Sequence, residues 1–391
     1  MRFEFATAGR IIFGNGAIRE AAPLAAELGS RAFVVTGRSG ERAGQLVELL
    51  KRQRIKSVTF NVPSEPTVAT VKAGVKQARE TTGDLVVAVG GGSVLDTGKA
   101  IAAMLANEGE LEDYLEVVGL GKPLRREPVP CIAIPTTAGT GAEVTRNAVL
   151  GLPEHGVKVS MRSPLMLPRL AVVDPELTHS MPPSVTASTG LDALTQLLEA
   201  FVSDKANPLT DGICREGIKR AARSLHRAWE NGGDRDARED MALASLFSGL
   251  DLANAKLGAV HGIAGPLGGM IPAPHGAACA RLLPYVMEKN VRALHREPEL
   301  EPVLARYDEI ARLLTGKTSA LAADGVAWVK GLCREFNIQP LAAFGLKAQD
   351  FPALVAKARN SSSMKGNPVR LSDDDLMEIL KESGRRHIRP Q

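Results

Sequence analysis

Along the first 180 residues, short apolar runs alternate with segments of helical periodicity. The runs are rich in β-branched residues, which is typical of strands buried on both faces of a parallel sheet. They lie at 32–36, 57–60, 85–89, 131–134 and 170–174, and apolar alternation at 3–13 predicts an opening hairpin or strand pair. The helical segments lie at 17–28, 41–54, 67–81 and 94–106. This alternation predicts a doubly wound α/β domain with a parallel sheet.

The pattern changes near Met181, Pro182 and Pro183. Helical periodicity dominates from there on, over residues 184–204, 208–230, 236–254, 259–265, 277–288, 302–315, 318–335 and 347–359. Ser372 precedes a run of aspartates and is therefore the expected N-cap of a last helix. We predict two domains, an α/β domain at 1–180 and an all-helical domain at 181–391, and the motifs below assign the first to dinucleotide binding and the second to metal and substrate.

The composition argues against several classes of function. The net charge of +4 on 391 residues and the 4% aromatic content do not favour nucleic-acid binding. The N-terminus lacks the pattern of a secretory signal, and no apolar run of about 20 residues predicts a membrane span. The four cysteines, Cys131, Cys214, Cys279 and Cys333, are scattered, which is typical of reduced thiols. We expect a cytoplasmic protein without membrane or nucleic-acid partners.

A glycine-rich segment, Gly90-Gly91-Gly92-Ser93, separates the strand at 85–89 from the helix that follows. Without side chains there, the backbone can approach a pyrophosphate, which the N–H groups of the helix N-terminus would bind. The alternative is a tight turn that requires positive φ angles. Because the segment follows a buried strand of an α/β sheet, phosphate binding is the favoured interpretation.

A second small, hydroxyl-rich segment follows the strand at 131–134 and runs from Pro135 to Thr145. The hydroxyls of Thr136, Thr137 and Thr140 can donate to phosphate, ribose or carboxamide oxygens. Alternatively, these threonines bond only their own backbone in an ordinary turn. Two such segments in one sheet favour a nucleotide.

The choice between the two nicotinamide cofactors depends on the residues after the strand at 32–36, which are Gly37 and Arg38. Enzymes that prefer NAD usually place an acid near such a strand end, whereas an arginine suits the 2′-phosphate of NADP. The alternative is an arginine that is merely solvated. We predict an NAD(P) cofactor, with NADP favoured over NAD.

Polar residues from separate segments predict a divalent-metal site. Asp192 and Gln196 are about one helical turn apart and share a face. His261 and His275 flank a segment rich in glycine and proline, which we expect to be a loop that brings the two rings together. The alternatives are structural histidines and an aspartate that only interacts with the helix dipole. Glu199 is then either a supporting acid or a surface residue.

Taken together, these motifs resemble the iron-containing (group III) alcohol dehydrogenase family over nearly the whole chain. The resemblance rests on segments at 9–14, 90–99, 135–145, 174–177, 190–196 and 367–368, and on the spacing of His261 and His275. It implies a nicotinamide-dependent dehydrogenase in which a divalent metal, Fe²⁺ or Zn²⁺, polarises the oxygen of an alcohol or aldehyde. It also implies that Asp192, His261 and His275 are the catalytic and metal-binding residues.

The same resemblance implies further features. We add Asp96, Asn147 and Lys158 to the residues expected to bind the cofactor. The expected architecture is an N-terminal dinucleotide-binding domain and a C-terminal helical domain. The expected assembly is a homodimer.

Two positions depart from the family pattern. Gln196 stands where the family has a further histidine ligand, and an amide oxygen is a weaker ligand than imidazole for Fe²⁺ or Zn²⁺. Gln196 could coordinate the metal, hold a metal-bound water, or mark a site without metal. Gly265 stands where many members have a histidine near the proton path.

These departures leave alternatives to a metal-dependent dehydrogenase. The first is a reductase similar to the maleylacetate reductases, near relatives that are generally taken to act without metal. A lyase similar to the dehydroquinate synthases and a non-catalytic binding protein are the others. The Thr-rich segment and the spacing of the two histidines argue against the lyase.

Overall fold

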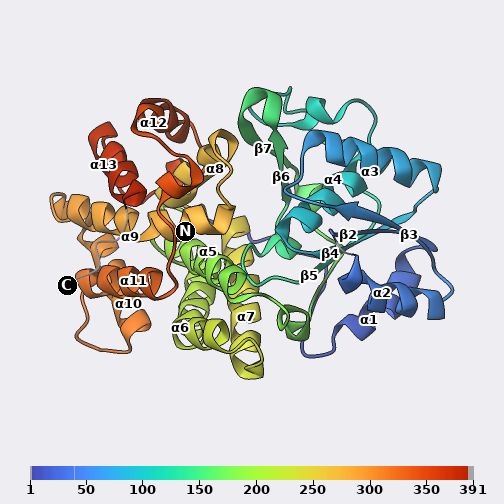
Figure 1. Ribbon diagram of the computed structural model, residues 1–391, viewed down its shortest axis with the longest axis horizontal. Helices are drawn as coiled ribbons and strands as arrows, with labels where there is room; N and C mark the ends of the chain where they lie inside the picture. Colours follow the sequence, from blue (N-terminus) through green and yellow to red (C-terminus); the bar gives the residue numbers. More distant parts are fainter. Residues whose placement is uncertain (1, 39, 386–391) are drawn as a thin grey trace. The chain divides into compact units, whose positions relative to one another are not determined.

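Figure 1 shows the computed structural model, which describes residues 2–38 and 40–385. Contacts within the chain divide it into two compact units, one formed by Phe5–Ser180 and the other by the chain from Met181 onwards together with the residues before Phe5. The first unit is an α/β domain, and the described part of the second contains helices and no strand. The predicted fold class is therefore confirmed.

Six parallel strands form the main sheet of the α/β domain, in the order β1-β8-β5-β4-β2-β3. The strands are β1 (Ile11–Phe13), β2 (Arg31–Gly37), β3 (Lys56–Val62), β4 (Leu85–Gly90), β5 (Cys131–Pro135) and β8 (Leu170–Val173). The register pairs Thr36 with Val89 and Gly90 with Pro135. The carboxyl ends of β2, β4 and β5 therefore reach the same edge of the sheet, which is where open α/β sheets bind ligands.

Helices cover both faces of this sheet (Figure 1). They are α1 (Ile18–Leu28), α2 (Glu41–Arg52), α3 (Val68–Glu80) and α4 (Gly92–Ala106). Because side chains alternate along a strand, Val87 and Val89 of β4 pack with α1 and α2, while Val86 and Ala88 pack with α3 and α4. All four side chains are fully buried. The carboxyl end of β4 is therefore anchored between two packed layers.

The predicted hairpin at 3–13 is wrong. Within that segment only Ile11–Phe13 is a strand, and it pairs in parallel with β8, where Ile11 lies beside Ala171. The alternation that suggested a hairpin includes Phe3, which is 46% exposed. A short edge strand acquires its partner from tertiary packing, which local alternation does not identify.

The α/β domain also contains an antiparallel hairpin that the apolar pattern does not reveal. Its strands are β6 (Asn147–Leu152) and β7 (Val157–Arg162), and Gly156 before β7 has a φ of 57°. Leu150 and Leu152 are buried, but Val149 is 37% exposed. An apolar residue on the exposed face therefore masks the alternation.

The helical unit contains nine α-helices in its described part: α5 (Pro183–Val202), α6 (Pro208–Glu230), α7 (Arg235–Asn254), α8 (Ala259–Met270), α9 (His275–Leu294), α10 (Glu301–Thr315), α11 (Ala322–Glu335), α12 (Phe351–Arg359) and α13 (Asp373–Gly384). Ser372 caps α13 as predicted, because its hydroxyl accepts a hydrogen bond from the backbone N–H of Asp375 at 3.1 Å. Across the described residues, every helix is too short or too polar to cross a membrane.

The predicted loop between His261 and His275 is wrong over most of its length. Helix α8 continues through Pro266 to Met270, and only residues 271–274 separate it from α9. A proline inside a helix costs about 3 kcal/mol relative to alanine, but α8 buries the apolar side chains of Val260, Ile263 and Leu267. Tertiary packing therefore overrides the local preference, and both histidines lie on helices.

Candidate functional site

The three predicted phosphate-binding glycines join β4 to α4. Gly90 ends the strand and Gly91 is the N-cap of the helix. None of Gly90, Gly91 and Gly92 has a positive φ, so a special backbone conformation does not explain them. Instead, a Cβ on Gly90 would lie 2.5 Å from a methyl group of Val94. Glycine is therefore required at position 90 because the side chain of Val94 lies close to the backbone, and not because the backbone forms a tight turn.

The glycine segment packs directly against the threonine-rich segment. A Cβ on Gly92 would lie 2.9 Å from the side chain of Thr140, and one on Gly91 would lie 3.4 Å from that of Thr137. The backbone N–H of Thr136 also donates to the carbonyl of Gly90 at 2.9 Å. The two predicted cofactor segments therefore form one continuous surface at the carboxyl edge of the sheet.

The hydroxyl-bearing residues of this surface differ in exposure. The side chain of Thr136 is fully buried, whereas Thr137, Thr140 and Ser93 are partly exposed. The first N–H groups of a helix lack partners within the helix, so the N-terminus of α4 offers donors next to these hydroxyls. The group can bind a phosphate through backbone N–H groups and partly exposed hydroxyls.

A buried lysine beneath this surface escaped the sequence analysis. Lys99 is 1% exposed, and its ammonium donates to the carbonyl of Ala142 and to the hydroxyl of Thr145, both at 2.9 Å. It also lies 3.0 Å from Oδ1 of Asp96, whose Oδ2 accepts a hydrogen bond from the backbone N–H of Val149. Asp96 therefore links α4 to β6, and the lysine ties both to the threonine-rich segment.

Glu143 is a second buried ionisable residue that the sequence analysis did not single out. It is 1% exposed, and burial raises the pKa of its carboxyl to about 7, although the charge of Lys99 acts in the opposite direction. Lys99 and Glu143 lie within the motif segments at 90–99 and 135–145. Their charge among mostly small residues is the sequence signal that could have identified them.

The remaining candidate cofactor residues lie on three strands or at their ends. Gly37 ends β2 with open space where a Cβ would be, and Arg38 after it is exposed. Asn147 begins β6, and Lys158 in β7 forms an ion pair with Glu65. Their contact with a cofactor stays a prediction.

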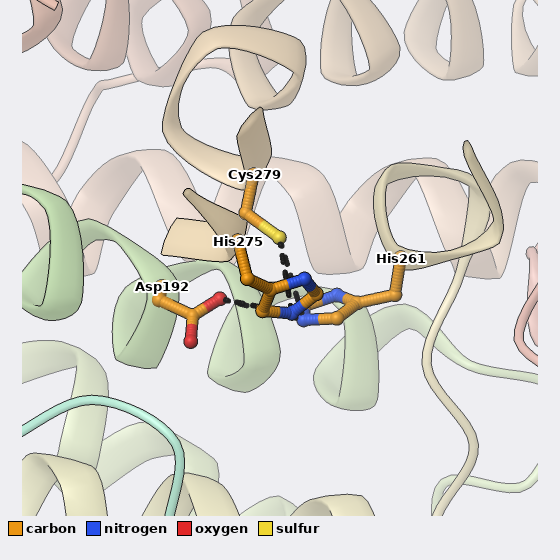
Figure 2. A group of neighbouring side chains, drawn as sticks. All are labelled: Asp192, His261, His275 and Cys279. Carbon is orange, nitrogen blue, oxygen red and sulfur yellow. Dashed lines mark hydrogen bonds and ion pairs between the residues drawn. The ribbon is translucent and has the colours of Figure 1, made fainter. Parts of the chain in front are cut away.

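Three of the four predicted metal ligands converge within the helical unit (Figure 2). Asp192 comes from α5, His261 from α8 and His275 from the start of α9. Oδ1 of Asp192 lies 3.6 Å from Nε2 of His261 and 3.8 Å from Nε2 of His275. The candidate ligand atoms of these residues and Cys279 all lie within 4.8 Å of one another.

Glu199 fixes the orientation of the His261 ring. Its Oε2 lies 2.6 Å from Nδ1 of His261, and its Oε1 accepts a hydrogen bond from the backbone N–H of Val260 at 2.6 Å. Because Glu199 accepts a hydrogen bond from Nδ1, a neutral His261 ring would carry its lone pair on Nε2, the nitrogen that faces Asp192. Glu199 is 6% exposed, so it is a supporting acid and not a surface residue.

Gln196 lies beside the cluster and contacts its aspartate. Its Nε2 donates to Oδ2 of Asp192 at 3.4 Å, and its side chain is buried. The amide therefore orients the carboxylate, while its predicted role as a metal ligand stays a prediction.

Cys279 belongs to the cluster, although the sequence predicted only a reduced thiol at this position. Its sulfur lies 3.7 Å from Nε2 of His261 and 3.6 Å from Nε2 of His275 (Figure 2). The available signal was its position four residues after His275, which places both side chains on one face of a helix.

The cluster favours positive charge. Burial would raise the pKa of Asp192, but the charges of His275 and His261 outweigh it and hold that pKa below its usual range. The Cys279 sulfur raises the pKa of His275 to about 9, against burial and with a contribution from Asp192. Burial would lower the pKa of His261, but Cys279, Asp192 and Glu199 raise it well above its ordinary value.

The residues of the cluster fit a divalent cation. Oδ1 of Asp192 is buried and accepts no hydrogen bond, although it faces two ring nitrogens. The two ring nitrogens lie at ion-pair distance from this oxygen, so a cation bound among them would contact all three groups. Carboxylate oxygen, imidazole nitrogen and thiolate sulfur are all zinc ligands in proteins.

Comparison with known families covers most of the chain. Residues 8–175 match the family described as iron-containing alcohol dehydrogenase, and residues 186–384 match the Fe-containing alcohol dehydrogenase family, C-terminal. The chain belongs to the iron-containing alcohol dehydrogenase family. It is thus an oxidoreductase of a metal-binding, NAD-dependent family, and the predicted resemblance is confirmed.

Several members of this family align with the chain over nearly their whole length. Alcohol dehydrogenase 4 of Saccharomyces cerevisiae is 33% identical over 377 residues, which are 95% of this chain and 96% of the relative. The crystal structure of a 1,3-propanediol oxidoreductase is 34% identical, with a TM-score of 0.89 and coverage of 98% and 100%. A sulfoacetaldehyde reductase from Bifidobacterium kashiwanohense, in complex with NAD⁺, is 30% identical, with a TM-score of 0.85 and coverage of 98% and 99%. The family therefore fixes the reaction type and not the substrate.

Gly265, the second departure from the family pattern, lies in α8 about one turn after His261. Nothing lies within 4 Å of the position that its Cβ would occupy. The position thus offers open space in this chain, where the resemblance to the family implies a histidine in many members.

Proposed function

We propose that this protein is an NAD(P)-dependent alcohol dehydrogenase or aldehyde reductase that uses a divalent metal, Fe²⁺ or Zn²⁺. Asp192, His261 and His275 hold the metal, which would act as a Lewis acid on the substrate oxygen. The observation that carries this proposal is the buried Oδ1 of Asp192, which lies 3.6 and 3.8 Å from two imidazole nitrogens. If the two histidines were only structural, we would expect them to donate hydrogen bonds to the carboxylate of Asp192. The observed separations are longer than hydrogen bonds.

The chain's own residues have distinct roles in this proposal. Asp192 supplies the negative charge, and the two imidazoles supply neutral nitrogen donors. Glu199 is a positioning residue, because it holds His261 in the tautomer that turns Nε2 inward. The N-terminus of α4 and the partly exposed hydroxyls of Ser93, Thr137 and Thr140 bind the pyrophosphate and ribose of the cofactor.

Proton transfer needs a route that does not use an imidazole at position 265. The open space beside Gly265 is large enough that no neighbour would contact a Cβ there. We propose that water in this space receives the alcohol proton during oxidation and returns it during reduction.

The substrate is a small alcohol or aldehyde, and nucleic acid and membranes are not partners. The protein is cytoplasmic and forms a homodimer.

The proposed preference for NADP over NAD depends on Arg38. Arg38 directly follows Gly37 at the carboxyl end of β2, and its side chain is exposed and available to a 2′-phosphate. The open space at Gly37 allows close approach of an adenosine ribose to this strand end.

A reductase that acts without metal is the second candidate. The observation that favours it is the hydrogen bond from Gln196 to Asp192, since an amide replaces the further imidazole of the family and engages the carboxylate. In that case Asp192, His261 and His275 would orient the substrate by hydrogen bonds alone.

Metal content and activity before and after chelation distinguish the two candidates. We expect the purified protein to hold close to one equivalent of metal per chain and to lose NAD(P)H-dependent aldehyde reduction when stripped. Asp192→Asn and His275→Ala should lower metal occupancy and turnover together. Arg10→Ala, at an exposed position in the α/β domain, is the control. Full activity in stripped protein would exclude the metal from the mechanism.

A further inference from the structure

We propose that Cys279 is the fourth protein ligand of this metal centre, in the place that Gln196 leaves open, so that the ligand set is one carboxylate, two imidazoles and one thiolate. The inference rests on the proposed function, because it assumes that Asp192, His261 and His275 hold a divalent metal.

The two sulfur–nitrogen distances fit tetrahedral angles at a metal, which would become five-coordinate when it also binds the substrate oxygen. With zinc–sulfur bonds of about 2.3 Å and zinc–nitrogen bonds of about 2.0 Å, a tetrahedral site separates sulfur from nitrogen by about 3.5 Å. The sulfur of Cys279 lies 3.7 Å from His261 Nε2 and 3.6 Å from His275 Nε2. Figure 2 shows the sulfur pointing toward both rings. Closing these separations requires shifts of only a few tenths of an ångström.

The position of Cys279 on its helix makes this arrangement rigid. Cys279 lies about one turn after His275 on α9, so the backbone of a single helix sets the spacing of the two side chains. Its side chain is fully buried. Cys279 therefore faces the centre of the cluster without competition from solvent.

The other cysteines of the helical unit differ from Cys279 in the atoms they face. Cys333 donates to the backbone carbonyl of Ala280 at 3.3 Å, and Cys214 donates to a carboxylate oxygen of Asp251 at 2.9 Å. Each of them faces a single oxygen acceptor. Cys279 instead faces two imidazole nitrogens in addition to the carboxylate of Asp192.

Gln196 is the competing candidate for the fourth ligand through its Oε1 atom, which is buried. The Nε2 atom, which cannot bind a metal, is 3.4 Å from Oδ2 of Asp192. Sulfur is also a softer donor than an amide oxygen and therefore favours Zn²⁺. A coordinating thiol loses its proton to solvent when the metal binds. The exchange of imidazole for amide at position 196 is thus compensated by a thiolate from α9.

Cobalt substitution of the full-length protein tests this ligand. Co²⁺ bound to a thiolate gives a sulfur-to-cobalt charge-transfer band in the near ultraviolet, which carboxylate and imidazole ligands do not give. We expect the band in the wild-type protein, its loss in Cys279→Ser, and its retention in Cys333→Ser. Cys333→Ser is a matched control because it also removes a buried thiol and a serine can keep the bond to Ala280. The affinity for Zn²⁺, measured by competition with a chromophoric chelator, should fall at least about tenfold in Cys279→Ser only.

X-ray absorption of the zinc-loaded wild-type protein gives a readout that needs no variant. One sulfur scatterer at about 2.3 Å supports the proposal. Bound Co²⁺ or Zn²⁺ with nitrogen and oxygen scatterers alone overturns the assignment of Cys279 and leaves the proposed function intact. A sulfur-to-cobalt charge-transfer band that persists in Cys279→Ser also overturns the assignment of Cys279 as a ligand. Wild-type protein that binds neither of these ions nor Fe²⁺ overturns the proposed metal dependence itself, and the ligand assignment with it.

Discussion

Glu199 and His261 form a carboxylate–imidazole pair, with Oε2 of the glutamate 2.6 Å from Nδ1 of the histidine. The same carboxylate accepts a hydrogen bond from the backbone N–H of Val260 through Oε1. Because both oxygens are engaged, the ring has one tautomer and one orientation. A single buried acid on α5 therefore determines which nitrogen on α8 faces Asp192.

Glu199→Gln should weaken metal binding without removing any proposed ligand. An amide that accepts from Val260 presents its NH₂ group to His261, which favours the tautomer with the hydrogen on Nε2. We expect the affinity for Zn²⁺ to fall about 10- to 100-fold. Competition with a chromophoric chelator measures the effect. Glu335→Gln, at an exposed position of α11, should leave the affinity unchanged. Equal affinities in both variants would show that Glu199 does not position the ring.

Gly92→Ala tests the contact between the two cofactor segments. The added Cβ would lie 2.9 Å from the side chain of Thr140, so Thr140 or the start of α4 must move. Overpacking of this kind costs about 1–3 kcal/mol, and we expect cofactor affinity to fall at least about fivefold. Titration of the nicotinamide fluorescence measures the change. Gly44→Ala is the control, because nothing lies within 4 Å of its Cβ position. Unchanged affinity in Gly92→Ala would remove this surface from the cofactor site.

Local pattern was sufficient for the fold class because the central strand has a clear signature. Each residue of β4 is fully buried, so Leu85–Val89 reads as an uninterrupted apolar run followed by glycines. Local pattern was not sufficient for the strand Ile11–Phe13. It pairs with β8, where Ile11 lies beside Ala171, and β8 is distant in sequence. Pairing between distant strands leaves no trace in the local pattern.

The candidate site was predictable where the residue type itself suggests chemistry. Asp192, His261 and His275 stand out because carboxylates and imidazoles bind metals. Cys279 does not, because buried cysteine is common and only the three-dimensional contacts show which atoms its sulfur faces. The role of Glu199 was open for the same reason, since spacing from Asp192 does not reveal a hydrogen bond to a helix far along the chain.

Arg38→Asp should change the cofactor preference. The substitution removes the cation proposed to bind the 2′-phosphate and introduces a charge that repels it. Because hydrogen bonds to charged groups contribute about 1.5–3 kcal/mol, we expect kcat/KM with NADPH to fall at least about tenfold and that with NADH to change less. Arg52→Asp, exposed at the end of α2, controls for the change in net charge. A wild-type protein as efficient with NADH as with NADPH would refute the preference for NADP.

Glu143 should make the stability of the protein depend on pH. Burial raises the pKa of its carboxyl from 4.5 to about 7 in the folded protein. The folded state therefore holds this proton more tightly than the unfolded state, and stability falls as pH rises from about 4.5 through about 7. The loss between pH 5 and pH 8 corresponds to about 2–3 kcal/mol.

Glu143→Gln should remove this loss, because the amide carries no proton to release. We expect the unfolding free energy of Glu143→Gln minus that of wild type, from urea titration, to be about 2–3 kcal/mol larger at pH 8 than at pH 5, because only the wild type loses stability over this range. Glu127→Gln, exposed in the same domain, should shift both values equally. A difference that is the same at pH 5 and pH 8 would mean that Glu143 is ionised throughout this range, and that the nearby charge of Lys99 outweighs the burial of the carboxyl.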